Sequence, residues 1–99
     1  MTTVVTPRGI PVRLTDERWS HIAEEHGELA GLRDRVLDAV ARPNRILAGS
    51  VGECLAVKEF EPGKHLVVVY RELREDAFII TAFLTRRVRS LDKRRQLWP

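Results

Sequence analysis

The hydrophobic pattern of this chain changes its period at Pro43, and that change limits the possible folds more than any other feature. Before Pro43, apolar positions recur every three or four residues, as in helices that bury one side. The first such stripe consists of Trp19, Ile22, Ala23 and His26. After Pro43, residues alternate in polarity or form β-branched runs, which favour strands. Because proline ends a helix, we expect helices first and a sheet afterwards.

Two helices are expected before this proline. Thr15 is a suitable N-cap for the first, and Gly27 is suited to end it in a left-handed conformation. The second is expected over residues 28–42, whose apolar stripe consists of Leu29, Leu32, Val36 and Val40. Residues 1–12 are predicted to be a loose lead-in or an edge strand, because the segment is interrupted by Pro7, Gly9 and Pro11.

Four strands are expected in the second half of the chain, over residues 46–48, 53–60, 65–71 and 78–85. Short connections rich in turn residues join them, and such connections make neighbouring strands antiparallel. The sequence therefore predicts an α+β fold in which two N-terminal helices pack on one face of a three- to four-stranded antiparallel sheet. A basic tail over residues 86–99 follows the sheet.

Composition sets the size of the protein and argues against several classes. The 99 residues suffice for one domain, residues 1–99, and 43% hydrophobic with 31% charged residues is a globular balance. The only cysteine, Cys54, cannot form an intrachain disulfide and is expected to be a small buried hydrophobe. No membrane span, secretory signal, metal-ligand cluster or Gly-rich phosphate loop is visible, so we expect a cytoplasmic protein with no membrane contact, metal or cofactor.

Positive charge is concentrated near the C-terminal end of the chain. Between residues 86 and 95 the only acid is Asp92, whereas the cations are Arg86, Arg87, Arg89, Lys93, Arg94 and Arg95. Such a segment is suited to binding phosphates. The alternative is a solvated tail that keeps the protein in solution.

Two histidines, His21 and His26, lie in the first predicted helix. Histidines that share a zinc ion on a helix are four positions apart, whereas these are five apart, or about 140° around the axis, so one metal cannot reach both. His26 lies on the apolar stripe and is expected to be packed. His21 points away from the stripe and is either an ordinary surface residue or a proton-transfer group, because imidazole titrates near neutral pH.

The last predicted strand has hydroxyl groups on one face. Alternation gives that face Ile79, Thr81, Phe83 and Thr85, and the other face is wholly apolar. If the helices cover the apolar face, Thr81 is free to donate a hydrogen bond to a bound phosphate. Arg71 and Lys58 lie on neighbouring strands and add cations. Ion pairs with nearby glutamates explain these two cations equally well, and threonine is common in strands without any function.

Three segments together resemble the phage-associated barnase–EndoU–colicin–RelE-like (BECR fold) nuclease group. These are Arg18-Trp19-Ser20-His21-Ile22 with His26, the strand Leu66-Val67-Val68-Val69-Tyr70-Arg71, and Ile80-Thr81-Ala82-Phe83-Leu84-Thr85 with its basic end. The resemblance extends over residues 12–98. It implies a RelE- or barnase-like domain and a metal-independent endoribonuclease, of a kind found among toxins and phage or mobile-element effectors.

The resemblance also implies roles for individual residues. The histidine of the first helix falls on His21 or His26, the strand cation on Arg71 and the final-strand hydroxyl on Thr81. We expect His21 to be the acid–base group, because the apolar stripe buries His26. RNA is the expected partner, together with a neutralising antitoxin or immunity protein, and the expected RNA contacts are Lys58, Thr85, Arg86, Arg87, Arg89, Lys93, Arg94 and Arg95. The alternative is a non-catalytic RNA-binding or protein-interaction module of the same fold.

Overall fold

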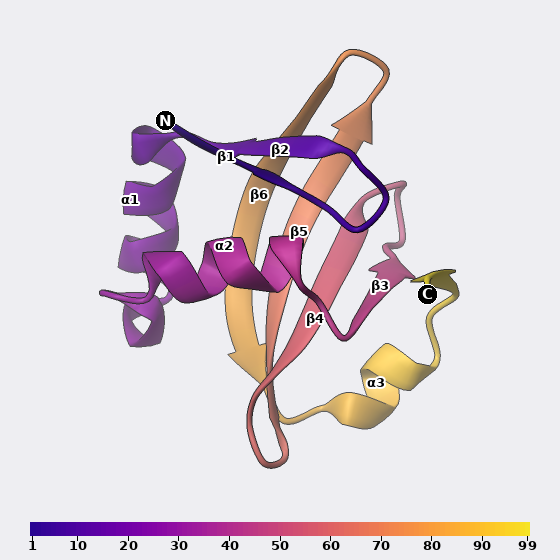
Figure 1. The fold of residues 1–99 in the computed structure, drawn as a ribbon. Coiled ribbons are helices and arrows are strands. Elements are labelled where there is room, and N and C mark those ends of the chain that lie inside the picture. The colour runs from indigo at the N-terminus through magenta and orange to yellow at the C-terminus, as the bar shows by residue number, and fades with distance from the viewer.

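The computed structural model describes all 99 residues and contains one seven-stranded mixed sheet (Figure 1). In chain order the elements are β1 (Thr2–Val5), β2 (Pro11–Leu14), α1 (Asp16–Glu25), the 3₁₀ helix η1 (Gly27–Leu29), α2 (Arg33–Ala41), β3 (Arg45–Ala48), β4 (Cys54–Glu61), β5 (Lys64–Leu73), β6 (Asp76–Thr85), α3 (Val88–Asp92) and β7 (Gln96–Trp98). The strands lie in the order β1-β2-β6-β5-β4-β3-β7. All neighbours are antiparallel except β2 and β6, which pair in parallel at Arg13 and Phe78.

The predicted architecture of two helices on a three- to four-stranded antiparallel sheet is therefore wrong. The four predicted strands are present as β3 to β6, but the sheet is extended at both edges. Residues 1–12 contain β1 and the start of β2, which form a hairpin around Gly9 at a φ of 83°. The predicted basic tail contains α3 and β7. These added strands have only three or four residues, which is too short for alternation to be recognised in the sequence.

The first helix begins as predicted, but the segment after it does not form the long second helix that was predicted. The Thr15 hydroxyl accepts a hydrogen bond from the Arg18 amide at 3.1 Å, which caps α1. The helix ends at Glu25, and a 3₁₀ turn follows in place of the start of a second α-helix. Gly31 then adopts a φ of 80°, a left-handed conformation that breaks any continuous helix, so that α2 is shorter than predicted.

One face of the sheet, which we call the helix face, holds the larger core. Its strand residues include Cys54, Ala56, Leu66, Val68, Tyr70 and Ala82, all buried. The helix α2 crosses in front of the strands, and the β1–β2 hairpin covers their upper part, while α1 stands beside β6 (Figure 1). The helices and the hairpin add Ile22, Val36, Val40, Val12 and Leu14 to the same core.

The opposite face, which we call the open face, is only partly covered. The short helix α3 inserts Leu91 against four strand residues, Leu47, Leu55, Val57 and Val67, and buries them. Beyond α3 the side chains of β5 and β6 are only half-buried. We call this uncovered part the open strip; it consists of Val69, Arg71, Phe78, Thr81, Phe83 and Thr85.

A β-bulge in β6 decides which side chains reach the open strip. Val69 pairs with Thr81 whereas Tyr70 pairs with Ile79, so Ile80 is an extra residue. The bulge reverses the alternation on its N-terminal side. Ile79 therefore joins the core of the helix face, although simple alternation had grouped it with Thr81. None of the helices is both long enough and apolar enough to cross a membrane.

Candidate functional site

The open strip brings together two of the predicted site residues, Arg71 and Thr81. Arg71 pairs with Phe78 across the β5–β6 ladder, and Thr81 pairs with Val69, two residues before Arg71 on the same face. Diagonal neighbours of this kind are about 7–8 Å apart, within reach of a long side chain. Thr85 continues the strip and pairs with His65. A hydroxyl and a cation therefore share one accessible surface.

His26 reaches the same strip from the side. It is the C-cap residue of α1, and its ring centroid lies 6.4 Å from that of Phe83. Phe83 stands between Thr81 and Thr85 on the same face of β6. The imidazole is half-buried, and its Nδ1 atom lies 3.7 Å from the Glu28 carboxylate. The end of α1 thus presents an imidazole at the outer edge of β6.

His21 occupies a different position. It is exposed on α1 and takes part in no side-chain hydrogen bond or ion pair. The angle of about 140° that separates the two histidines on a helix turns His21 away from the side that carries His26. The structure therefore brings His26, and not His21, to Phe83.

Arg71 is held by the connection between β3 and β4. Its Nη2 atom donates a hydrogen bond to the carbonyl oxygen of Val51 at 3.2 Å. Arg94 holds the same connection and donates to the Ala48 carbonyl and to the Ser50 hydroxyl, both at 3.3 Å. The pKa of Glu53 is lowered, first by backbone N–H groups of Val51 and of Glu53 itself and then by the nearby charges of these two arginines. Two guanidinium groups therefore lie near one carboxylate.

Lys58 lies on the other side of the sheet. It follows Cys54 and Ala56 in the alternation of β4, so its side chain points to the helix face. There its Nζ atom lies 2.9 Å from Asp38 of α2, which also accepts a hydrogen bond from Arg42. The hydrogen bond from Lys58 is the largest cause of the lowered pKa of Asp38. The structure thus separates Lys58 from the other predicted RNA contacts.

The basic segment, residues 86–95, begins where the open strip ends. Arg86 lies 3.5 Å from Glu61, and Arg94 donates a hydrogen bond to the Ala48 carbonyl. The single acid of the segment, Asp92, pairs with Arg45 of β3 at 2.8 Å. The remaining cations form no salt bridge and are exposed; they are Arg87, Arg89, Lys93 and Arg95. Thr85 accepts a hydrogen bond from the Arg87 amide at 3.0 Å, which ties the start of this segment to the strip.

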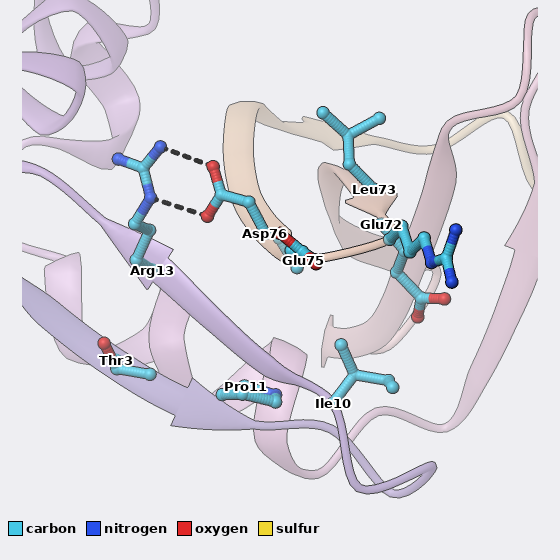
Figure 2. Close-up of a pocket in the computed structure, with 10 residues that line it drawn as sticks. Thr3, Ile10, Pro11, Arg13, Glu72, Leu73, Glu75 and Asp76 are labelled. Atoms are coloured by element: carbon cyan, nitrogen blue, oxygen red, sulfur yellow. Dashed lines mark hydrogen bonds and ion pairs between the residues drawn. The ribbon is translucent and has the colours of Figure 1, made fainter.

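The largest cavity lies at the opposite end of the molecule from His26. It has a volume of about 620 Å³ and lies between the β1–β2 and β5–β6 hairpins (Figure 2). Arg13 and Asp76 close one side of it through two parallel hydrogen bonds of 3.0 and 2.8 Å. These bonds lower the pKa of Asp76. Of the residues predicted to act on RNA, none lines this cavity.

Two reactive groups of the helix face are sequestered. Cys54 and Tyr70 are paired in register and buried, and burial is the main cause that raises the pKa of each. The prediction that Cys54 is a buried hydrophobe is confirmed. Neither residue is an ionised nucleophile at neutral pH.

Sequence reasoning missed two residues of the open side, Glu28 and His65. Glu28 follows His26 by two positions, a spacing at which a helix end can fold a carboxylate back toward an imidazole. His65 was included only as the start of a strand, and its partnership with Thr85 depends on the β5–β6 register. Its Nδ1 atom is buried without a hydrogen-bond partner.

Comparison with protein-family models, curated proteins and solved structures yields no significant match. No group of three or more His, Cys, Asp or Glu side chains is arranged to hold a metal ion.

Proposed function

We propose that this protein is a metal-independent endoribonuclease whose substrate lies along the open strip. The observation that carries the proposal is the approach of His26 to Phe83, which stands beside Thr81 on β6. An imidazole and a hydroxyl are the groups needed to move a proton and to bind a phosphate. The resemblance to BECR nucleases assigned a helix-one histidine and this threonine to the same task.

The proposed reaction uses the 2′-hydroxyl of the substrate as its nucleophile. His26 takes the proton of this hydroxyl, the 2′-oxygen forms a bond to the adjacent phosphorus, and the bond from phosphorus to the 5′-oxygen breaks. Thr81 donates a hydrogen bond to a phosphate oxygen, and Arg71 supplies positive charge on the same face. The departing 5′-oxygen accepts a proton, a role that we propose for His65, which pairs with Thr85 on the same face. The products are a 2′,3′-cyclic phosphate and a 5′-hydroxyl end.

Glu28 has a positioning role in this scheme. A carboxylate near Nδ1 orients the ring. The basic segment binds the flanking phosphates of the RNA through its unpaired cations. As with the nucleases that the chain resembles, we propose that it acts as a toxin or mobile-element effector and that a neutralising partner covers the strip.

The test is cleavage of a broad RNA pool in the presence of EDTA. Wild-type protein is compared with His26→Ala, His21→Ala and Thr81→Val, and Arg42→Ala is the control on the far side of the molecule. Loss of the proton-transfer group should lower the rate about 10²–10⁴-fold. A matched DNA pool should remain intact, because DNA lacks the 2′-hydroxyl. Full activity of both histidine variants would show that neither His26 nor His21 carries the reaction.

The unpaired cations of the basic segment favour a second candidate, an RNA-binding module without catalysis. Binding of RNA by four exposed cations does not depend on His26 or Thr81. This module would bind the RNA pool with strong salt dependence but leave it uncut. Binding without cleavage by the wild type therefore selects this candidate.

A further inference from the structure

We infer that the open strip accepts a single strand of RNA, about four to six nucleotides long, and that Arg71 and Arg94 form a phosphate subsite at the end of the strip remote from Thr85. The inference rests on the proposed function and names the class of its substrate. It also assigns to Arg94 a role that differs from that of the other cations in the basic segment.

The narrow width of the open strip favours a single strand of RNA over a duplex. On the β4 side it is limited by α3, whose Leu91 buries Val67 in the middle of β5. On the other side β6 has no strand neighbour beyond Phe78, and α1 stands beside it (Figure 1). The accessible surface is therefore about one to two β-strands wide, or roughly 5–10 Å. Domains that recognise duplex RNA span about 16 base pairs across successive minor grooves, whereas this molecule is 33 Å in its longest dimension.

The two arginines have the donors that a phosphate needs. Each hydrogen-bonds only to neutral oxygen atoms of residues 48–51, and neither lies within 4 Å of a carboxylate oxygen. A guanidinium group has five N–H donors, so both retain donors for a ligand. Glu53 offsets one of the two positive charges, and the net charge of the pair with its carboxylate remains positive. Charge-assisted bonds from two guanidinium groups are the usual way to hold a phosphate.

The spacing along β5 gives the length of the bound strand. Arg71 lies six residues beyond His65, which pairs with Thr85 at the start of the basic segment. At about 3.4 Å per residue this distance is roughly 20 Å. Stacked nucleotides rise about 3.4 Å each, so six of them cover the strip, and a more extended strand covers it with fewer. Phe83 is half-buried between the two ends and offers an aromatic surface on which one base can stack.

The experiment uses strands that cannot be cleaved, so that binding is measured apart from catalysis. A labelled eight-nucleotide 2′-O-methyl RNA is titrated with the full chain, both alone and annealed to its complement. We expect the single strand to bind at least about tenfold more tightly. Affinity for strands of two, four, six and eight nucleotides should rise steeply up to about six, and the further gain at eight should come only from the basic segment. Equal affinity for duplex and single strand, or full affinity for a dinucleotide, would overturn the inference.

Variants test the phosphate subsite. Arg94→Gln should lower the slope of log affinity against log salt by about 0.7, the value for one phosphate contact on a single strand. Arg42→Gln removes the same charge from α2 and should leave the slope unchanged. Ser50→Ala removes one acceptor of Arg94 but keeps its charge, and it should also leave the slope unchanged. If Arg94→Gln has the slope of the wild type, or if Ser50→Ala weakens binding equally, Arg94 only anchors the β3–β4 connection and the subsite does not exist.

These outcomes separate the inference from the proposed function. Cleavage of RNA without preference for the single strand contradicts the inference alone. Tight binding of the single strand without cleavage contradicts the proposed function alone. If neither form of RNA binds, both are wrong, and the open strip is then a surface for a protein partner.

Discussion

The two faces of the sheet differ in how completely they are covered and in how their charges are satisfied. The helix face is buried under two helices and a hairpin, and its charged residue on β4, Lys58, is paired with Asp38. The open face is buried only beneath the five residues of α3, and it adjoins four cations that have no acidic partner. Burial on one side of a thin domain supplies most of its stability, which leaves the other side free to carry groups that favour binding.

Variants that change one face at a time should separate stability from activity. If the two faces differ in function as described, changes in the open strip lower activity with little loss of stability, and changes in the helix face do the reverse.

The largest effect is expected for His26→Ala. Cleavage of RNA in EDTA should fall about 10²–10⁴-fold, because the substitution removes the proposed proton acceptor. The free energy of unfolding should change by less than about 1 kcal/mol, since the imidazole is only half-buried. Urea denaturation of the same preparation provides the control. A parallel loss of stability and activity would mean that His26 is a packing residue.

The next largest effect is expected when a cavity is made in the helix face. Ile79→Ala, at a residue 2% exposed, should lower the free energy of unfolding by about 2–5 kcal/mol. Val69→Ala, in the open strip, should cost less because its side chain is already in contact with water. Equal losses of unfolding free energy in urea denaturation would show that the two faces contribute equally to stability.

A charge change in the basic segment should alter binding but not folding. Replacement of Arg87, Arg89, Lys93 and Arg95 by Gln should reduce the salt dependence of single-strand binding by up to about 2.8, since each phosphate contact contributes about 0.7. Tm should change little, because none of the four forms a salt bridge. Truncation after Thr85 is not an equivalent test, because it removes Leu91 and β7 and exposes the core beneath them. An unchanged salt slope would make these cations solubilising groups only.

The smallest effect is expected for the stability that the Asp38–Lys58 ion pair of the helix face contributes at acidic pH. The folded pKa of Asp38 is lowered, so its contribution to stability is complete above the unfolded pKa, near 3.8, and is lost as the pH falls through the folded value. For a partly exposed pair the loss should be under about 1 kcal/mol. Asp38→Asn should show less acid destabilisation than the wild type in urea titrations below pH 4. Identical pH profiles would indicate that the pair adds no stability.

Much of the sheet could be predicted from the sequence, because its long strands carry a strong local signal. The run from Leu66 to Arg71 and the run from Phe78 to Thr85 are β-branched and aromatic, and both lie in strands as predicted. The edges were less predictable, because an edge strand within residues 1–12 was only one of two alternatives and residues 86–99 were predicted only as a basic tail. β7 pairs with β3, and the β1–β2 hairpin joins the sheet through β6; both partners lie far along the chain, and short strands are stabilised by such pairing more than by their own residues.

The candidate site was predictable in its residue types but not in its geometry. Alternation placed Thr81 on the less covered face, and the register confirms that Arg71 is its neighbour. The bulge at Ile80 left no signal in the sequence, so the side of Ile79 was predicted wrongly. The favoured histidine was His21 because a stripe residue was assumed to be inaccessible. His26 lies at the very end of α1, where the chain leaves the helix, and a stripe position at a helix end is not fully covered.

The single parallel pairing between β2 and β6 has a consequence for the order in which the protein folds. It joins segments that are about 63 residues apart in the chain, as the Arg13–Asp76 bonds show, whereas β3 to β6 are linked by short turns. Closing a long loop costs more chain entropy than closing a turn, so contacts within the meander can form first. We therefore expect the β3–β6 meander to nucleate folding and the β1–β2 hairpin to dock late. In native-state hydrogen exchange, the amides of β1 and β2 should open more often than those in the middle of β5.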